Sequence, residues 1–242
     1  MDDNFKTNIF ICSYLRQDFT QKTLEYLRAR TKTPYLLFLL DNGGNSRFAK
    51  DVDYYISFSN NLGIHAIWNV ALALATTDYF IVADNDLLVP DLEPDWLSQM
   101  IKIMDKNPDY GAISMHPHIF IGAVPIDPNV KEDVVERNMC GAVFRIMRRN
   151  AVYQAGGWEH KIDPQRNNEE RTICSRLQAM EYKVGITPRI RAYHMFGKNM
   201  VGTWGYPTEV TPELQGHRPE LWDYVKNFDN IEAYNEKTFL PK

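Results

Sequence analysis

Two aspartates stand one residue apart at the end of an apolar run, in the segment YFIVADNDLLVP at residues 79–90. In an extended chain, Asp84 and Asp86 point to the same side and can converge on one ligand. Carboxylate oxygens suit Mg²⁺ or Mn²⁺ better than they suit soft metals. The spacing therefore indicates a divalent cation at the end of a strand, although acidic residues also follow strands simply because a turn does.

Two adjacent glutamates, Glu169 and Glu170, begin a segment whose apolar residues recur at helical spacing. A carboxylate in this position can take the proton of a hydroxyl group as a general base. Acidic residues are also favoured in the first turn of a helix by the helix dipole, with no catalysis involved. From the residues alone, both interpretations stay open.

Three further residues have side chains that suit ligand binding. His194 ends an apolar segment, where an imidazole is either a metal ligand or a packed side chain. Trp158 and Glu159 follow a glycine pair, and an aromatic ring beside an acid can stack on a sugar and hydrogen-bond it. Alternatively, the glycines form a turn and the tryptophan fills the core.

Several arginines could recognise an anion if the fold brought them together. Arg145, Arg148 and Arg149, if grouped with Arg189 and Arg191, would face an acceptor that carries phosphate. The alternative is a strand exit whose charges are simply hydrated.

The elements that must position these residues alternate between strands and helices in the first half of the chain. Helices are predicted from a capping box at Asp18 and Gln21 to about Arg30, and across residues 64–75. Apolar runs predict strands at Asn8–Tyr14, Tyr35–Leu40, Tyr54–Phe58 and from Tyr79. This alternation predicts parallel pairing in an open, doubly wound sheet, which binds ligands beyond the carboxyl ends of its strands.

The second half has a less regular pattern. Helices are predicted at Trp96–Asn107, with Asp95 as the cap, and at Glu169–Met180. The predicted strands are Ala112–Met115, Ala142–Met147, Tyr182–Ile186 and Ile190–His194. The stretch GAVPIDPNVKEDVVERN at residues 122–138 is interpreted as a long functional loop. The tail at 201–242, with GTWGYP, is expected to be a packed tail or a lid.

The composition favours one folded domain. The chain has 242 residues, of which 44% are hydrophobic and 24% charged, and its formal net charge is -4. This length suits a single α/β core, and the charge disfavours a surface built for polyanions. Its start, MDDNFKTN, is polar, and no integral membrane segment is expected, because no apolar run approaches about 20 residues. We expect a cytoplasmic protein whose cysteines, Cys12, Cys140 and Cys174, are reduced and buried.

The order of these motifs resembles the nucleotide-sugar glycosyltransferases of family two, which have the GT-A fold. The matching series is a strand ending CSY, a strand ending DNGG, the stretch NNLG with Asn69 after it, and then TDYFIVADND. The match continues through CGAVFRIMRRNAVYQAGGWEH and NNEERTICSRLQAMEYKVGITPRIRAYHMFG, and covers about residues 8–197. It implies a single GT-A-like α/β domain with a mixed, mostly parallel sheet, a donor-binding half at about 1–90 and an acceptor-binding half at about 91–200.

The resemblance also implies a role for each matching residue. Asp86 would hold Mn²⁺ or Mg²⁺ with His194, and Asp84 would contact the ribose or a metal-bound water. Glu170 would be the base, or Glu169 in its place, because glutamate here replaces the aspartate of the family. The donor site would comprise Ser13, Tyr14, Asp41, Asn61, Gly63 and Asp84, and the sugar or acceptor site Gly141, Trp158 and Glu159. Capping of a helix is the alternative for Asn60 and Gly63.

The implied reaction moves a hexose or related sugar from a nucleoside diphosphate, expected to be UDP, to an acceptor hydroxyl with inversion. The acceptor is a saccharide, a protein side chain or a hydroxylated base in nucleic acid. The absence of a QxxRW motif favours single transfer over polymerisation. Three alternatives stay open: a retaining GT-A enzyme, a non-enzymatic binding module, and a nucleotidyltransferase, although CSYLRQD lacks the glycines of a nucleotidyltransferase phosphate loop.

Overall fold

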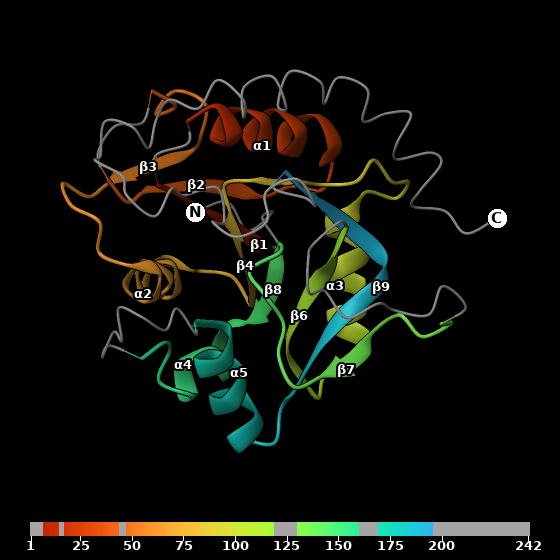
Figure 1. Ribbon diagram of the computed structural model, residues 1–242. Coiled ribbons are helices and arrows are strands. Elements are labelled where there is room, and N and C mark those ends of the chain that lie inside the picture. The colour runs from red at the N-terminus through yellow and green to blue at the C-terminus, as the bar shows by residue number, and fades with distance from the viewer. Residues whose placement is uncertain (1–6, 15–16, 44–46, 119–129, 160–168, 196–242) are drawn as a thin grey trace.

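The computed structural model describes residues 7–14, 17–43, 47–118, 130–159 and 169–195, and within these ranges the chain folds around one mixed sheet (Figure 1). The nine strands of this sheet follow the order β3-β2-β1-β4-β8-β6-β9-β5, and β7 pairs with β9. Four neighbouring strands at one end are parallel, which confirms the predicted mostly parallel α/β sheet flanked by helices.

The first half supplies the parallel part of the sheet and two helices. Its elements are β1 (Thr7–Ser13), α1 (Gln17–Arg30), β2 (Leu36–Asp41), β3 (Tyr54–Ser57), α2 (Ile64–Leu74) and β4 (Tyr79–Asp84). Ser13 is level with Asp41 across β1 and β2, and Cys12 is level with Asp84 across β1 and β4. The carboxyl ends of three strands therefore meet at one edge, where an open α/β sheet binds its ligands.

The second half adds antiparallel strands and three helices. Its elements are β5 (Leu87–Leu88), α3 (Trp96–Lys106), β6 (Tyr110–His118), β7 (Val135–Arg137), β8 (Arg145–Arg148), α4 (Arg149–Gln154), α5 (Glu169–Ala179) and β9 (Lys183–His194). β8 runs antiparallel between β4 and β6, and β6 pairs in parallel with β9. β8 thus joins the two halves into one continuous sheet.

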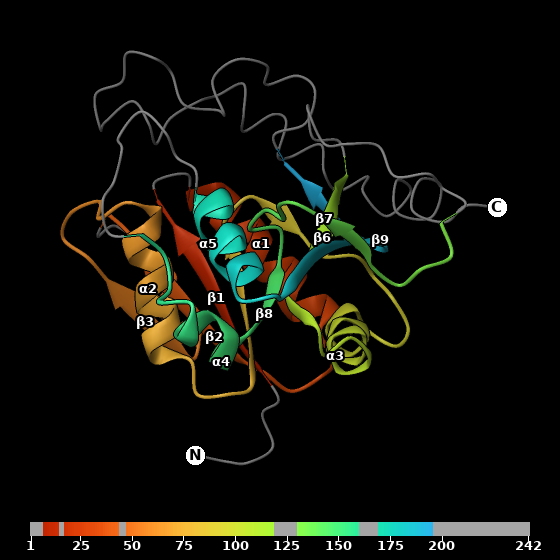
Figure 2. The same cartoon turned by 90° about the horizontal axis from the view of Figure 1, so that it is seen from below.

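Two layers of apolar side chains cover the sheet, one on each face. On one face, Leu24 and Leu27 of α1 pack in the same cluster as Trp96 and Met100 of α3. On the other face the cluster contains residues of α2, α4 and α5, which lie together in Figure 2. Because α3 repeats its apolar residues at helical spacing, one stripe of the helix is buried while the opposite side is hydrated.

Two predicted strand boundaries are corrected by the backbone. β8 begins at Arg145 and not at Ala142, because Phe144 has a positive φ of 44°, which interrupts the extended chain. The two predicted strands at 182–186 and 190–194 are a single strand, β9. The register between β6 and β9 jumps from the Met115–Thr187 pair to the His116–Arg191 pair, so the intervening residues bulge without ending the strand.

Other elements differ from the sequence pattern for local reasons. α1 begins at Gln17, so Asp18 lies in the first turn of the helix and is not its cap. β7 lies inside the stretch interpreted as a loop and is held there by pairing with β9. The short elements β5 and α4 were not predicted, because two or six residues carry too little periodicity. The predicted tail at 201–242 lies outside the described residues.

Within the described ranges, no helix is both long enough and apolar enough to cross a bilayer. The three cysteines are unbridged and buried, as predicted. The Sγ atoms of Cys140 and Cys174 are 3.9 Å apart, which joins α5 to the segment before β8.

Asp95 caps α3, as predicted, and also anchors the turn before β2. Its side chain accepts hydrogen bonds from the amides of Leu97 and Ser98, and from the amides of Lys32 and Thr33. Burial acts to raise the pKa of this carboxyl, but the hydrogen bonds from Ser98 and Thr33 outweigh it, so the pKa is lowered.

We expect Asp95→Ala to lower the free energy of unfolding by about 2–4 kcal/mol, because a cap and several buried donors lose their acceptor. Asp95→Asn should lose less, because its amide oxygen still caps α3. A group with a lowered folded pKa contributes stability above its ordinary pKa of 3.8 and loses it as the pH falls through the folded value. The difference between wild type and Asp95→Ala in urea unfolding should therefore shrink as the pH falls below 3.8; a constant difference would contradict this.

Candidate active site

The ends of β1 and β2 form the first wall of the site. Asp41 is buried at the end of β2, and its Oδ2 accepts a hydrogen bond of 2.5 Å from the hydroxyl of Tyr55 on β3. The ring of Tyr14 lies so close to Gly43 that a Cβ at Gly43 would come within 3.1 Å of it. An aromatic ring and a fixed carboxylate are therefore both present at this edge of the sheet, which suits a planar base and its N–H groups.

The loop between β3 and α2 is fastened to the end of β2. The side chain of Asn42 donates to Oδ1 of Asn61 at 2.8 Å and accepts from the amide of Leu62 at 2.8 Å. Oδ1 of Asn61 also accepts from the amide of Gly63, which has a φ of 79° and caps α2. Asn61 and Gly63 therefore shape this loop, and Gly63 stands at the N-cap position of α2 without a side-chain cap.

Asp86 and His194 lie together at the rim. Asp86 is in the turn after β4, and Nε2 of His194 at the end of β9 is 3.7 Å from Oδ1 of Asp86. Both side chains are buried, with 3% and 7% of their surface exposed. The amide of Met195 donates to the carbonyl of Asp86 at 2.9 Å. This hydrogen bond fixes the end of β9 against residues 84–86, which we call the acidic turn. The structure therefore brings these two predicted metal ligands next to each other.

A network of buried polar side chains supports the turn between the two aspartates. The side chain of Asn85 donates to the hydroxyl of Thr20, which is 2.9 Å from the hydroxyl of Ser13. The hydroxyl of Thr23 donates to the carbonyl of Asn85 at 2.9 Å. Ser13 was predicted to contact the donor, but its hydroxyl joins this network, so we assign it to the support of the acidic turn.

Glu169 is enclosed by two donors. Its Oε2 accepts a hydrogen bond of 2.9 Å from the guanidinium of Arg145 and another of 2.9 Å from the indole of Trp158. Arg145 is completely buried on β8. Burial alone would lower the pKa of Arg145, but the charge of Glu169 outweighs it and raises that pKa. The arginine therefore stays charged, and Glu169 is a partner in a buried ion pair.

Glu170, the next residue, faces a different environment. It is half-buried, and a Cβ built on Gly141 would lie 3.8 Å from its Oε1. Burial, followed by the charge of Glu169, raises the pKa of Glu170 to about 7, while Arg145 acts in the opposite direction. A carboxyl with this pKa exchanges its proton near neutral pH, which suits a general base.

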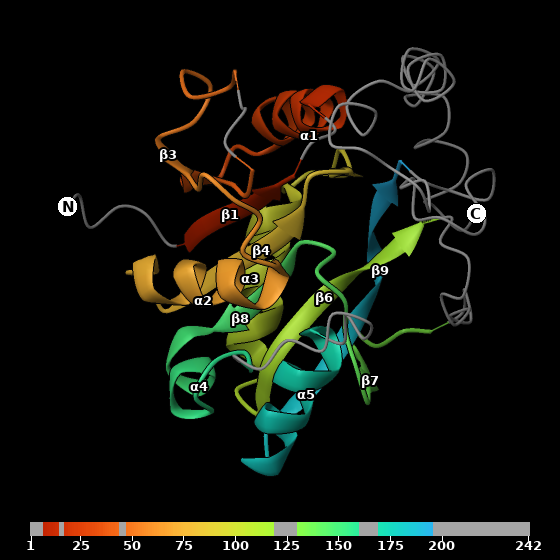
Figure 3. The same cartoon turned by 60° about the vertical axis from the view of Figure 1, so that its left-hand side comes forward.

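One backbone segment connects Glu170 to the acidic turn. The amide of Asp84 donates to the carbonyl of Ala142 at 3.3 Å, and Gly141 lies beside Glu170. The segment 140–142 therefore has the end of β4 on one side and the start of α5 on the other (Figure 3). This arrangement places the two predicted acidic sites, about 85 residues apart in the sequence, around one short stretch of chain.

The stacking role predicted for Trp158 is corrected by the structure. The ring has 0% exposure and its indole N–H is used by Glu169, so no face is available to a sugar. The side chain of Asn69 accepts from the amide of Trp158 and donates to its carbonyl. Glu159, which follows, is exposed. Of the two interpretations that the sequence left open for Trp158, the structure supports the one in which the tryptophan fills the core.

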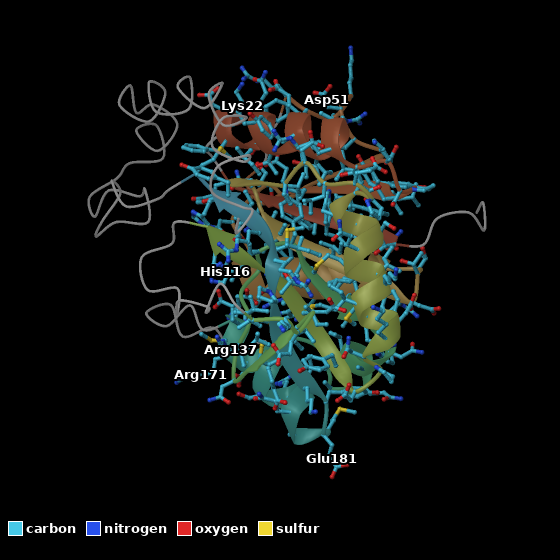
Figure 4. All side chains as sticks on the ribbon, turned by 90° about the vertical axis from the view of Figure 1, so that its right-hand side faces the viewer. Lys22, Asp51, His116, Arg137, Arg171 and Glu181 are labelled. Atoms are coloured by element: carbon cyan, nitrogen blue, oxygen red, sulfur yellow. The ribbon has the colours of Figure 1, made fainter. Side chains whose placement is uncertain are left out.

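The arginines are not gathered into one anion site. Arg148 lies over the ring of Tyr79 and donates to the carbonyls of Met104 in α3 and Tyr110 in β6. Arg189 pairs with Asp133 at 2.8 Å. Arg149 begins α4 next to β4. Figure 4 shows that the labelled Arg137 and Arg171 lie on a flank far from Lys22 and Asp51.

Within the described residues, no three histidine, cysteine, aspartate or glutamate side chains gather as a metal-binding group. The Asp86–His194 pair alone still fits a hard cation. Such ions are usually bound in nucleotide sites by one or two protein ligands, with phosphate oxygens and waters completing the shell. A carboxylate oxygen and an imidazole nitrogen are both donors that Mn²⁺ accepts.

Two kinds of comparison identify relatives of this chain. The sequence model of the family described as Glycosyl transferase family 2 matches residues 8–181. The glucosyl-dolichyl phosphate glucuronosyltransferase of Haloferax volcanii is 26% identical over 249 residues, which cover 92% of this chain and 74% of that protein. The family match spans the acidic turn, the segment before β8 and the start of α5.

Solved structures show the same fold at low identity. A mannosyltransferase from Pyrobaculum calidifontis in complex with GDP-Man and Mn²⁺ has a TM-score of 0.61 and 13% identity, covering 80% of this chain and 57% of that one. GalNAc-T7 with UDP, GalNAc and Mn²⁺ has a TM-score of 0.68 and 13% identity, covering 98% of this chain and 51% of that one. The chain thus spans little more than half of these two solved proteins. The likeness confirms the predicted GT-A fold.

Proposed function

The chain belongs to glycosyl transferase family 2 and is a glycosyltransferase, and on that basis we propose that it moves a sugar from a UDP-sugar to an acceptor hydroxyl with inversion. The observation that carries the mechanism is the position of Glu170 beside Gly141, with the end of β4 on the other side of the same segment. Family membership also sets aside the nucleotidyltransferase and the non-enzymatic module considered from the sequence.

The nucleoside is proposed to bind between Tyr14 and Asp41. The tyrosine ring offers a face for stacking, and the carboxylate can accept a hydrogen bond from the ring N–H of uracil. The hydroxyl of Tyr55 orients the carboxylate from the far side. Guanine also has a ring N–H, and a screen of UDP-sugars and GDP-sugars distinguishes the two nucleobases.

The diphosphate is proposed to lie over the acidic turn. Asp86 and His194 would hold Mn²⁺ or Mg²⁺, and Asp84 would contact the ribose or a metal-bound water. A bound divalent cation neutralises the charge that grows on the leaving diphosphate. Asn85, fixed by Thr20 and Thr23, keeps the turn in one conformation, so these ligands need not reorganise when the donor binds.

The chemical step is proposed to use Glu170 as the base. Its carboxylate takes the proton of the acceptor hydroxyl while the acceptor oxygen forms a bond to the anomeric carbon of the donor. The bond from that carbon to the diphosphate oxygen breaks, and its electron pair leaves with UDP. A single displacement of this kind inverts the anomeric centre. Glu169 is not proposed as the base, because Arg145 and Trp158 already occupy its Oε2.

The acceptor is proposed to be a hydroxyl of a saccharide. The relative from Haloferax volcanii is named for glucuronosyl transfer to a glucosyl-dolichyl phosphate, so its acceptor carries a sugar. In this chain the half-buried Glu170 and the small Gly141 leave the segment before β8 accessible to a hydroxyl. A protein side chain and a hydroxylated nucleic-acid base are the alternatives that an acceptor screen would test.

The proposal is tested by a donor screen that measures nucleoside diphosphate release with Mn²⁺ present. We expect release from at least one UDP-sugar, faster when a saccharide acceptor is added, and little from GDP-sugars. The anomeric configuration of the product, read by NMR, should be opposite to that of the donor. Retention would contradict the role of Glu170 as the base, and release only from GDP-sugars would contradict the proposed UDP donor.

A further inference from the structure

A buried polar cluster connects β8, α5 and α2 behind the proposed base. Its members are Arg145, Glu169, Trp158 and Asn69, joined by hydrogen bonds of 2.9 to 3.0 Å. Arg145 and Trp158 have 0% exposure, so these contacts are shielded from water. A charged pair in this setting is costly to desolvate, and removal of one partner leaves an uncompensated buried charge.

The guanidinium of Arg145 contacts both sides of the site. One nitrogen donates to Oε2 of Glu169 in the first turn of α5, and another donates to the carbonyl of Cys140 at 2.9 Å. Cys140 directly precedes Gly141, and Glu169 directly precedes Glu170. A single planar group therefore fixes the two chain segments that face each other at the proposed base.

Trp158 is the second donor to Oε2 of Glu169, the same oxygen that Arg145 contacts. The side chain of Asn69 on α2 donates to the carbonyl of Trp158 and accepts from its amide. The residue before Trp158, Gly157, has a φ of 64°. A Cβ at Gly157 would come within 2.4 Å of Oδ1 of Asn69, so only glycine allows this close approach. The indole N–H is thereby held at a fixed place for Glu169.

We propose that Arg145 and Glu169 form a positioning pair, which holds the carboxylate of Glu170 against Gly141 and sets the charge that Glu170 experiences. This inference rests on the proposed function of Glu170 as the base. Neither partner touches a substrate in this scheme. The arginine acts through the backbone of Cys140 and through Glu169, and Glu169 acts through its neighbour on the helix.

The charged and titratable groups around Glu170 come from three elements. On its own helix the neighbour is Glu169, whose charge raises the pKa of Glu170, and from β8 it is Arg145, whose charge lowers that pKa. The thiols of Cys140 and Cys174 lie beside the same ion pair, and the pKa of Cys140 is raised by its hydrogen bond with Cys174 and by burial. After burial, which has the largest effect, the two members of the ion pair are the charges that shift the pKa of Glu170, in opposite directions.

The test is the pH dependence of kcat/KM for Glu169→Gln. The glutamine oxygen can still accept from Arg145 or Trp158, so the variant should fold, and binding of UDP with Mn²⁺ should not change. Removing the negative charge beside Glu170 makes ionisation of its carboxyl easier. The acidic limb should therefore shift to lower pH by about one unit, and kcat should fall by about tenfold as positioning weakens.

Two further variants keep the test decisive. Arg145→Lys preserves the charge but loses the two-pronged contact, so the acidic limb should stay near its wild-type position while kcat falls. The matched control, Glu25→Gln on α1, changes an exposed glutamate and should leave the profile unchanged. An unshifted acidic limb in Glu169→Gln would overturn the proposal. If Glu170→Gln is inactive in that case, only the positioning pair fails; if Glu170→Gln is active, the proposed base fails as well.

Discussion

Replacing Glu170 with glutamine is expected to lower kcat by about 10³-fold while leaving UDP binding intact, because the acceptor hydroxyl loses the group that accepts its proton. In free-energy terms the barrier rises by about 4 kcal/mol. The measurement is product formation under saturating donor and acceptor, together with calorimetric titration of UDP in Mn²⁺. Glu25→Gln serves as the exposed control. Wild-type turnover in Glu170→Gln would remove the residue from the mechanism.

The same variant should make the protein more stable in alkaline solution. Burial and the charge of Glu169 raise the folded pKa of Glu170 to about 7, above its ordinary value of 4.5. A group with a raised folded pKa contributes stability that is fully present below the ordinary value and is lost as the pH rises through the folded value. Glu170→Gln cannot ionise, so at pH 8 it should exceed wild type in unfolding free energy by about 1–2 kcal/mol.

The combination of these two results separates a base from a structural residue. A residue that only packs α5 would lower activity and stability together when replaced. A buried carboxyl kept ionisable for catalysis lowers the stability of the folded protein at alkaline pH, which glutamine relieves. At pH 4, where the wild-type carboxyl is protonated in both states, the two proteins should unfold at the same urea concentration. A stability deficit of Glu170→Gln at pH 8 would contradict the raised pKa.

The sheet edge could be predicted from the sequence because its determinants are local. Each strand of the parallel half is a short apolar run that ends in a polar residue, and parallel strands connected by helices bring those ends to one edge. Ser13, Asp41 and Asp84 therefore meet whatever the details of packing. Asp95 was also recognised from local pattern, since a helix cap contacts only residues two and three positions away.

The sequence alone could not show which of Glu169 and Glu170 faces the site and which faces the protein interior. Adjacent residues on a helix project about 100° apart, so one faces inward and the other faces the site, but the pattern does not say which. The answer depends on Arg145, which is 24 residues earlier and buried on another strand. An arginine flanked by apolar residues, as in AVFRIM, is the signal that could have indicated a buried ion pair.

The role of Trp158 could not be decided from the sequence for a related reason. An aromatic residue after two glycines fits both a sugar platform and a core residue, and only the neighbours decide between them. Here Asn69 and Glu169 use all the polar groups of the residue. The pattern GGW together with an asparagine on an earlier helix gave no indication of this contact, because the two residues are 89 positions apart.

Replacing Asp86 with asparagine is expected to abolish Mn²⁺-dependent turnover, with kcat lower by at least about 10³-fold, while the fold persists. The amide is nearly isosteric and keeps an oxygen, but it lacks the charge that makes a carboxylate a strong ligand of hard cations. The carbonyl of Asp86 still accepts from Met195, so the turn and the end of β9 should keep their conformation. Nucleoside diphosphate release measured against Mn²⁺ concentration should rise in wild type and stay flat in the variant.

The large fall in kcat expected for Asp86→Asn follows from the buried position of the Asp86 carboxylate. Asp86 and His194 are both buried at the rim, so a charge removed there is poorly replaced by water. His194→Ala should therefore be milder than Asp86→Asn, because it removes a neutral ligand and leaves the carboxylate. The matched control is Asp51→Asn, which changes an exposed residue between β2 and β3, labelled at the top of Figure 4. Calorimetry should show UDP binding that depends on Mn²⁺ in wild type and control only; equal dependence in Asp86→Asn would place the cation on other residues.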